Sequence, residues 1–174
     1  MFLNKFYDEG SFATIVAVWN NGQWIGYGDS VAFCYNKKTG ELQHSFTSLS
    51  DFNNPPYLIN CKDPLNPIGF RPGKFDVVTT SVLFAASDAL AHYILLMYEV
   101  AHRDVFQNEL QEAVNAQTRN SDYIKAAMGA TRVDFEDVIK KLPLCNNQGN
   151  FRKHLQSLRK KGLIGHDDYS IAMF

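Results

Sequence analysis

The chain has 174 residues, of which 45% are hydrophobic and 20% charged, and its 17 Lys and Arg residues are balanced by 18 Asp and Glu residues. This composition is typical of one globular domain over residues 1–174, and it excludes an overall positive field that would attract nucleic acid or anionic lipid. No stretch approaches the ~18 apolar residues that span a bilayer, and the polar N-terminus does not resemble a signal peptide, so we expect a cytoplasmic protein with no membrane partner.

The three cysteines show no pattern of a metal site or a disulfide framework. Cys34, Cys61 and Cys145 are odd in number and widely separated, and none of them has a paired spacing. We therefore expect reduced thiols that act as packing residues.

The first part of the chain is predicted to form two antiparallel hairpins. Residues 11–19 (SFATIVAVW) and 23–28 (QWIGYG) are rich in β-branched and aromatic residues and flank the turn signal Asn20-Asn21-Gly22. A second hairpin is expected from residues 31–35 (VAFCY) and 41–47 (ELQHSFT) around a loop that ends in glycine. Asp29 lies in the link between the hairpins, directly after a strand.

A long loop is predicted next. Residues 48–74 are rich in Pro, Asn, Asp and Gly, which disfavour regular structure over most of the segment. Loops of this length are often functional. Arg71 could contact a phosphate there, but an arginine beside Pro and Gly in a loop is more often solvated.

A buried strand and a group of helices follow the loop. Residues 82–86 (VLFAA) are predicted as the strand, which stops at Ser87-Asp88. Helices are expected over residues 89–102, 104–117, 121–128, 134–142 and 151–161. In the last ten residues (GHDDYSIAMF), the pair Asp167-Asp168 precedes a closing strand.

Asp88 has two interpretations at its junction. It could cap the helix by accepting a hydrogen bond from a free backbone N–H, or it could be a metal-binding carboxylate at the sheet edge. Asp29, Asp88 and the pair Asp167-Asp168 all lie at strand ends, where carboxylates can converge. Because Mg²⁺ and Mn²⁺ need oxygen ligands, this pattern favours a divalent-cation site without requiring one.

Three motifs, in this order, resemble the C-terminal half of the metal-dependent protein phosphatases of the PP2C type. FATIVAVW followed by WIGYGDSVAFCY is similar to the paired strands that lead into Gly-Asp-Ser in that family. VLFAASDAL resembles its apolar strand ending in Ser-Asp-Gly, and GHDDYSIAMF resembles its closing strand. The resemblance covers nearly the whole chain. It implies an α/β fold of the α+β type, an antiparallel β-sandwich flanked by helices, without the N-terminal part of the family fold.

The resemblance also implies a function. Asp88 and Asp167 would each ligate one of two bridged Mn²⁺ or Mg²⁺ ions, Asp29 would lie at a weaker third site, and Asp168 and His92 are further candidates. The substrate would be a phosphorylated protein carrying phosphoserine or phosphothreonine, or a small phosphomonoester. Metal-activated water would hydrolyse it, without a catalytic Ser or Cys.

The chain departs from the family pattern, and the departures leave other functions open. Ala89 replaces the usual glycine after Asp88, and His92 stands where the family often has an aspartate. A histidine can ligate Mn²⁺, but a solvated histidine on the helix face is the alternative. The early acidic ligand and the Asp-Gly-x-x-Gly element of the family's first half are not found. We therefore expect either a missing N-terminal segment that completes the site or an inactive interaction module with this fold. We also expect the isolated chain to self-associate through sheet edges and apolar faces that the first half would cover.

Residues 151–164 (FRKHLQSLRKKGLI) favour a different function. They form an amphipathic basic segment that resembles the recognition helix of a winged-helix DNA-binding domain. A wing needs a hairpin after that helix, whereas only one strand follows here. Because the whole chain is nearly neutral, a solvated helix face explains the basic residues better, and we expect no nucleic-acid partner.

Overall fold

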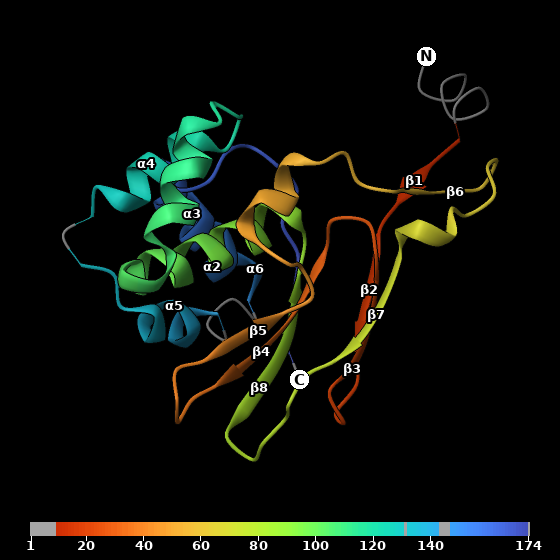
Figure 1. Cartoon of the computed structure of the whole chain (residues 1–174), viewed down its shortest axis with the longest axis horizontal. Coiled ribbons are helices and arrows are strands. Elements are labelled where there is room, and N and C mark those ends of the chain that lie inside the picture. Colours follow the sequence, from red (N-terminus) through yellow and green to blue (C-terminus); the bar gives the residue numbers. More distant parts are fainter. Residues whose placement is uncertain (1–9, 131, 143–146, 174) are drawn as a thin grey trace.

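Three antiparallel sheets and a group of helices build the fold (Figure 1). The computed structural model describes residues 10–130, 132–142 and 147–173. The first sheet pairs β1 (Phe12–Ala13) with β6 (Ile59–Asn60). The second has three strands, in the order β2 (Ile15–Val18), β3 (Gln23–Tyr27) and β7 (Phe70–Lys74). The third has four strands, in the order β5 (Leu42–His44), β4 (Val31–Asn36), β8 (Ser81–Ala86) and β9 (Ile171–Met173). The helices are α2 (Asp88–Ala101), α3 (Arg103–Asn115), α4 (Ser121–Met128), α5 (Phe135–Lys141) and α6 (Gln148–Lys160), with short 3-10 helices η1 (Leu49–Asn53) and η2 (Pro67–Gly69). The predicted α/β class with antiparallel sheets is thus confirmed. None of the helices in these ranges is long and apolar enough to cross a membrane.

Both predicted hairpins are present. β2 pairs with β3 around the Asn-Asn-Gly turn, with Val18 opposite Trp24. Gly22 has a φ of 86°, and a Cβ atom there would lie 2.5 Å from the carbonyl oxygen of Phe75, so the turn requires glycine. The predicted first strand is divided at Thr14, because β1 leaves β3 and pairs with β6 instead.

The prediction of an irregular loop over residues 48–74 was wrong at its C-terminal end. β7 pairs with β3 along its whole length, from Phe70 opposite Tyr27 to Lys74 opposite Gln23. Pro72 is tolerated because β7 is an edge strand, where a missing N–H breaks no ladder on the outer side. The neighbour that makes these residues a strand is almost fifty positions away, so local composition does not reveal it.

The four-stranded sheet separates two apolar cores, because side chains alternate along its strands. Phe33 and Phe84 stack with ring centroids 4.9 Å apart and face the helices. Ala32, Cys34 and Leu83 face the other way and pack with Val16, Val18 and Trp24 of the three-stranded sheet. The result is a layer order of sheet, sheet and helices, visible from right to left in Figure 1.

The cysteines behave differently from one another. Cys34 is 1% exposed, which confirms its predicted packing role. Cys61 is exposed, so the same prediction was wrong for this residue, which lies in a surface segment after β6. Cys145 lies outside the described residues.

All five predicted helices are present, with ends within three residues of those expected. α2 is the central helix: Ile94, Leu95 and Leu96 are at most 1% exposed. α6 buries Leu155 and Leu158 against this core, and β9 then pairs with β8. Within the described residues no hairpin follows α6, so the wing of a winged-helix domain is not present there.

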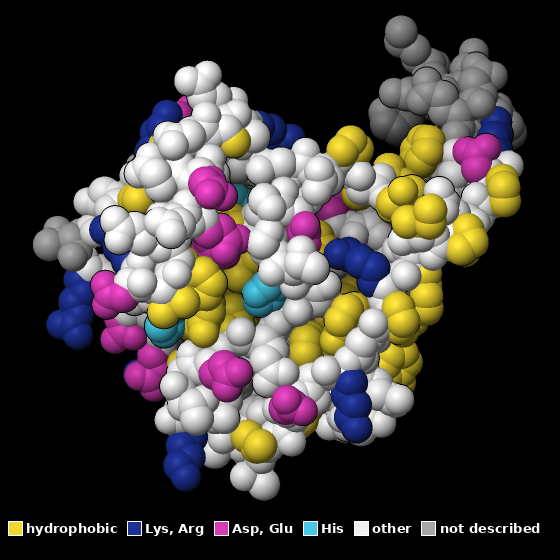
Figure 2. All heavy atoms as spheres, in the orientation of Figure 1, with side chains coloured by type: hydrophobic (Ala, Val, Ile, Leu, Met, Phe, Trp, Pro, Cys, Tyr) yellow, Lys and Arg dark blue, Asp and Glu magenta, His cyan; other side chains and the backbone are white. Residues whose placement is uncertain are grey.

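Apolar side chains remain exposed over the part of the molecule that carries β1, β6 and β7 (Figure 2). The most exposed large ones there are Ile68 (75%), Leu65 (56%), Phe12 (55%), Phe70 (51%), Trp19 (48%) and Ile15 (47%). Ile15 and Phe70 both pair with Tyr27, so they lie in one row on one face of the three-stranded sheet. The segment before β7 covers the middle of this row, because Tyr27 is 4% exposed, packs against Tyr57 and accepts a hydrogen bond from the N–H of Asn66 at 3.0 Å, so only the two ends of the row are exposed.

Candidate functional site

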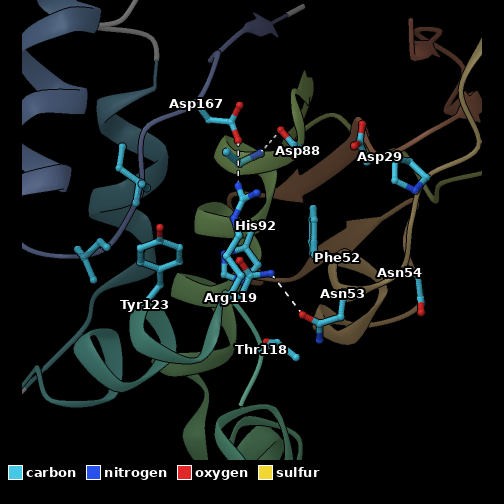
Figure 3. Close-up of a pocket in the computed structure, with 16 residues that line it drawn as sticks. Asp29, Phe52, Asn53, Asn54, Asp88, His92, Thr118, Arg119, Tyr123 and Asp167 are labelled. Atoms are coloured by element: carbon cyan, nitrogen blue, oxygen red, sulfur yellow. Dashed lines mark hydrogen bonds and ion pairs between the residues drawn. The ribbon is translucent and has the colours of Figure 1, made fainter. Parts of the chain in front are cut away.

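Strand register brings three of the predicted site residues to one end of the four-stranded sheet. Ala86, the last residue of β8, lies opposite both Val31 of β4 and Ile171 of β9. Asp29, Asp88 and Asp167 stand two to four positions from this row and line one cavity of about 390 Å³ (Figure 3). The remaining walls come from η1 and the residues after it, α2, the α3–α4 turn, the start of α4 and the segment before β9. Their lining residues are Phe52, Asn53, Asn54, Pro56, Ala89, His92, Thr118, Arg119, Asn120, Tyr123, Leu163, Ile164 and Gly165.

Asp88 is the first residue of α2 rather than its cap. Ser87 holds the cap position, with extended backbone, but makes no side-chain capping bond. The Asp88 carboxylate accepts a hydrogen bond from the backbone N–H of Ala89 at 2.6 Å. The capping interpretation was therefore wrong by one position. Burial raises the pKa of Asp88, and the charges of Asp29 and Asp167 raise it further, whereas the Ala89 hydrogen bond and Arg119 lower it.

Asp29 lies between this cavity and an adjoining one of about 310 Å³ that contains Arg71. Burial raises the pKa of Asp29, and Asp167 adds to the increase, whereas its own backbone N–H and Arg71 lower it. Arg71 is half-buried: it donates to the carbonyl of Gly28 at 2.6 Å and lies 4.5 Å above the ring of Phe46. The expectation of a solvated Arg71 was wrong, because this arginine holds the link that carries Asp29.

Asp167 is held near Asp88 by backbone pairing around Ser87. The N–H of Ser87 donates to the carbonyl of Ser170 at 3.0 Å, and the Ser87 hydroxyl donates to the carbonyl of Asp168 at 3.3 Å. The Asp167 carboxylate accepts from the Asp168 N–H at 2.9 Å and forms an ion pair with Arg119 at 3.2 Å. Asp168 itself is exposed and does not line the cavity.

His92 forms part of the cavity wall from the second turn of α2. It is only 6% exposed, and its Nε2 has no hydrogen-bond partner among the described residues. Its ring packs edge-on against Phe52, at 5.2 Å between centroids, and near Tyr123, at 6.4 Å. Burial, with the charge of Arg119, lowers its pKa to about 4, so the imidazole is neutral at pH 7. The interpretation of His92 as a solvated residue was wrong.

The cavity is lined by three carboxylates, as a cation site would be, but the potential ligands among the described residues do not form a complete coordination sphere. The charge of Asp167 raises the pKa of both Asp29 and Asp88, and a bound divalent cation would relieve that repulsion. The neutral, unpartnered nitrogen of His92 is a further donor of the kind that Mn²⁺ accepts. Yet the described part of the chain has no group of three or more His, Cys, Asp or Glu side chains arranged to hold a metal ion.

Comparison with protein-family models, curated proteins and solved structures finds no match.

Several wall residues had no signal in the sequence. Arg119 lies in the turn between two predicted helices, where an arginine is ordinarily solvated, and Asn53 and Asn120 belong to polar loop segments. The two asparagines are in contact, because the side-chain amide of Asn120 donates a hydrogen bond to the side-chain oxygen of Asn53 at 3.4 Å. Only the packing of η1 and the α3–α4 turn against α2 places them at the same cavity as the carboxylates.

Proposed function

We propose that this chain carries the cation-binding half of a metal-dependent phosphatase site of the PP2C type. The observation that supports the proposal is the strand register that places Asp29, Asp88 and Asp167 around one cavity. Asp88 and Asp167 would hold Mn²⁺ or Mg²⁺, with Asp29 nearby and His92 as a further donor. Such a pair of ions lowers the pKa of a bound water and orients a phosphate for in-line attack.

The substrate class that suits this cavity is a phosphomonoester, either a phosphoserine or phosphothreonine side chain or a small molecule. Arg119, Asn53 and Asn120 line the same cavity as Asp29 and Asp88, and their side chains carry N–H donors. Nucleophilic attack by a side chain is not needed, because water is the attacking group. The lining residues present no cysteine, and Thr118 is the one hydroxyl-bearing aliphatic residue among them.

The first test is the binding of Mn²⁺, measured by calorimetry. Asp88→Asn and Asp167→Asn should each weaken Mn²⁺ binding at least tenfold, because each removes a charged ligand, while circular dichroism shows the fold intact. Asp137→Asn, on the exposed face of α5, is the matched control and should bind like the wild type. Equal affinities in all four proteins would refute the metal assignment.

Hydrolysis of p-nitrophenyl phosphate by the isolated chain with Mn²⁺ is expected to be low. Mg²⁺ and Mn²⁺ prefer about six ligands each, and three carboxylates and one imidazole leave most positions to water. A segment that supplies a further acidic ligand and an Asp-Gly-x-x-Gly element, added in trans or by fusion, should raise turnover by orders of magnitude.

A second candidate function is an interaction module that keeps the fold without catalysis. The observation in its favour is that the described carboxylates are not arranged as a metal-binding group, and that Asp167 is paired with Arg119 instead. For this function Mn²⁺ would bind neither to the wild type nor to Asp88→Asn, and Asp88→Asn would leave partner binding unchanged. The calorimetric titration therefore separates the two candidates.

A further inference from the structure

Arg119 is the one Lys or Arg side chain among the described residues that line the cavity. It projects from the α3–α4 turn toward the carboxylates, with its guanidinium directed at Asp167 (Figure 3). Asp88 and His92, one turn apart on α2, line the same cavity as Arg119. The guanidinium of Arg119 is therefore available to a ligand that binds in this cavity beside the carboxylates and His92.

The turn that carries Arg119 is firmly held. Gln117 has a φ of 51°, the only positive φ among the described non-glycine residues, which turns the chain sharply after α3. The hydroxyl of Ser121, a residue only 3% exposed, accepts from the N–H of Thr118 at 3.0 Å and donates to the carbonyl of Ala113 at 3.0 Å. The side chain of Asn120 donates to Asn53 of η1. The backbone of Arg119 is thus fixed on both sides.

The ion pair that Arg119 makes is of a kind that exchanges easily. The Arg119 and Asp167 side chains are 77% and 34% exposed and are joined through Nη2 at 3.2 Å. Exposed pairs of this type contribute at most about 1 kcal/mol. A guanidinium has five N–H donors in a planar fork that matches two phosphate oxygens, so a phosphoryl group is a better partner than one carboxylate oxygen.

We propose that Arg119 binds the phosphoryl group of the ligand in this cavity, and that its ion pair with Asp167 couples anion binding to cation binding. The coupling rests on the proposed function, whereas the anion site does not. With neither ligand present, Arg119 and Asp167 neutralise each other. A cation that takes Asp167 releases Arg119, and a phosphate that takes Arg119 releases Asp167. Binding of either ligand therefore breaks the ion pair that competes with binding of the other. By thermodynamic linkage, each ligand must raise the affinity for the other by the same factor.

The test uses inorganic phosphate and Mn²⁺ as probes in calorimetric titrations of the whole chain. Phosphate should bind up to about fivefold more tightly with saturating Mn²⁺ than without it, because the ion pair that is released is worth at most about 1 kcal/mol, and Mn²⁺ should gain by the same factor from phosphate. Heats of the complex that the two ions form in buffer are subtracted with a titration lacking protein.

The deciding variant is Arg119→Gln. It should lose at least tenfold in phosphate affinity and should lose the coupling, while Mn²⁺ alone binds a few-fold more tightly because a positive charge next to Asp167 is gone. Arg119→Lys keeps the charge without the fork and should recover only part of the phosphate affinity. Arg152→Gln, an exposed arginine on α6, is the control and should match the wild type in every titration.

The outcomes separate this inference from the proposed function. Mn²⁺ binding that depends on Asp88 and Asp167, together with phosphate binding that Arg119→Gln leaves unchanged, overturns the inference and leaves the cation site standing. Phosphate binding that depends on Arg119 with no Mn²⁺ binding at all supports the anion site and refutes the coupling and the metal-dependent function. If Arg119→Gln keeps the circular dichroism spectrum of the wild type but binds neither Mn²⁺ nor phosphate, the expected gain in Mn²⁺ affinity is contradicted. That result refutes the proposal that Arg119 and Asp167 exchange their ion pair for the two ligands.

Discussion

Glu99 is a titratable residue buried among apolar side chains. It lies near the end of α2, is 1% exposed, and its Oε2 has no hydrogen-bond partner among the described residues. Burial raises its pKa from 4.5 to about 8, with a smaller increase from Glu109, against a lowering by the backbone N–H of Leu49. The folded protein therefore holds this carboxyl neutral at pH 7, whereas the unfolded chain ionises it.

This difference predicts how the free energy of unfolding depends on pH. The folded pKa is raised, so the contribution of Glu99 is fully present below about pH 4.5 and is lost as the pH rises to about 8. The shift corresponds to a loss on the order of 4–5 kcal/mol over that range. Glu99→Gln should remove this slope and unfold at higher urea concentration than the wild type at pH 8. Glu112→Gln, exposed on α3, should keep the slope; a slope that survives in Glu99→Gln would assign it to other groups.

The sequence predicts some of the site residues but not others. Asp29, Asp88 and Asp167 were predicted to share a site because each lies at the end of a recognisable strand, and they do line one cavity. Arg119 and the burial of His92 were not predicted, because neither depends on the local pattern. Both follow from how η1 and the α3–α4 turn pack over α2, which is a tertiary effect.

Among the elements, β7 shows the limit of local reasoning most clearly. The hairpins and helices were predicted because turn residues and apolar spacing lie within each segment. β7 has a proline and a glycine in its five residues and becomes a strand only by pairing with β3. Gly73 is required there, because a Cβ atom would overlap the ring of Trp24, which stacks on Phe75 between the two sheets.

Gly73→Ala should therefore destabilise the contact between the two sheets. Trp24 would have to move out of its packed position, and overpacking of this kind costs about 1–3 kcal/mol. Urea unfolding followed by tryptophan fluorescence measures the loss and the change in the environment of Trp24. Gly26→Ala in β3, where the nearest atom to the new Cβ lies 4.0 Å away, is the control and should be close to neutral. Equal stability of both variants would show that β7 is not packed as described.

For the molecule as a whole, the exposed apolar side chains on the edge strands of the three-stranded sheet predict self-association. Ile15 and Phe70 lie on the two edge strands, at either end of the row through Tyr27, and are 47% and 51% exposed. Uncovered faces and edges of this kind bind other chains. The double variant Ile15→Glu and Phe70→Glu should be monomeric where the wild type forms dimers or larger species, as measured by light scattering after size exclusion.

A matched control for this prediction lies on the other side of the molecule. Val105 on α3 is 76% exposed but stands apart from this face, so Val105→Glu should associate like the wild type. A wild-type chain that stays monomeric at high concentration would contradict the prediction.

The row of Val31, Ala86 and Ile171 also has a consequence for synthesis. Asp29 and Asp88 leave the ribosome well before Asp167, and β9 is the last described strand to add to the sheet. A polypeptide released anywhere between residues 102 and 165 would carry Asp29, Asp88 and the whole of α2, but it would lack Asp167 and β9. Such a polypeptide would leave β8 without its partner β9, so the end of the sheet where the carboxylates gather is completed only when β9 has been synthesised.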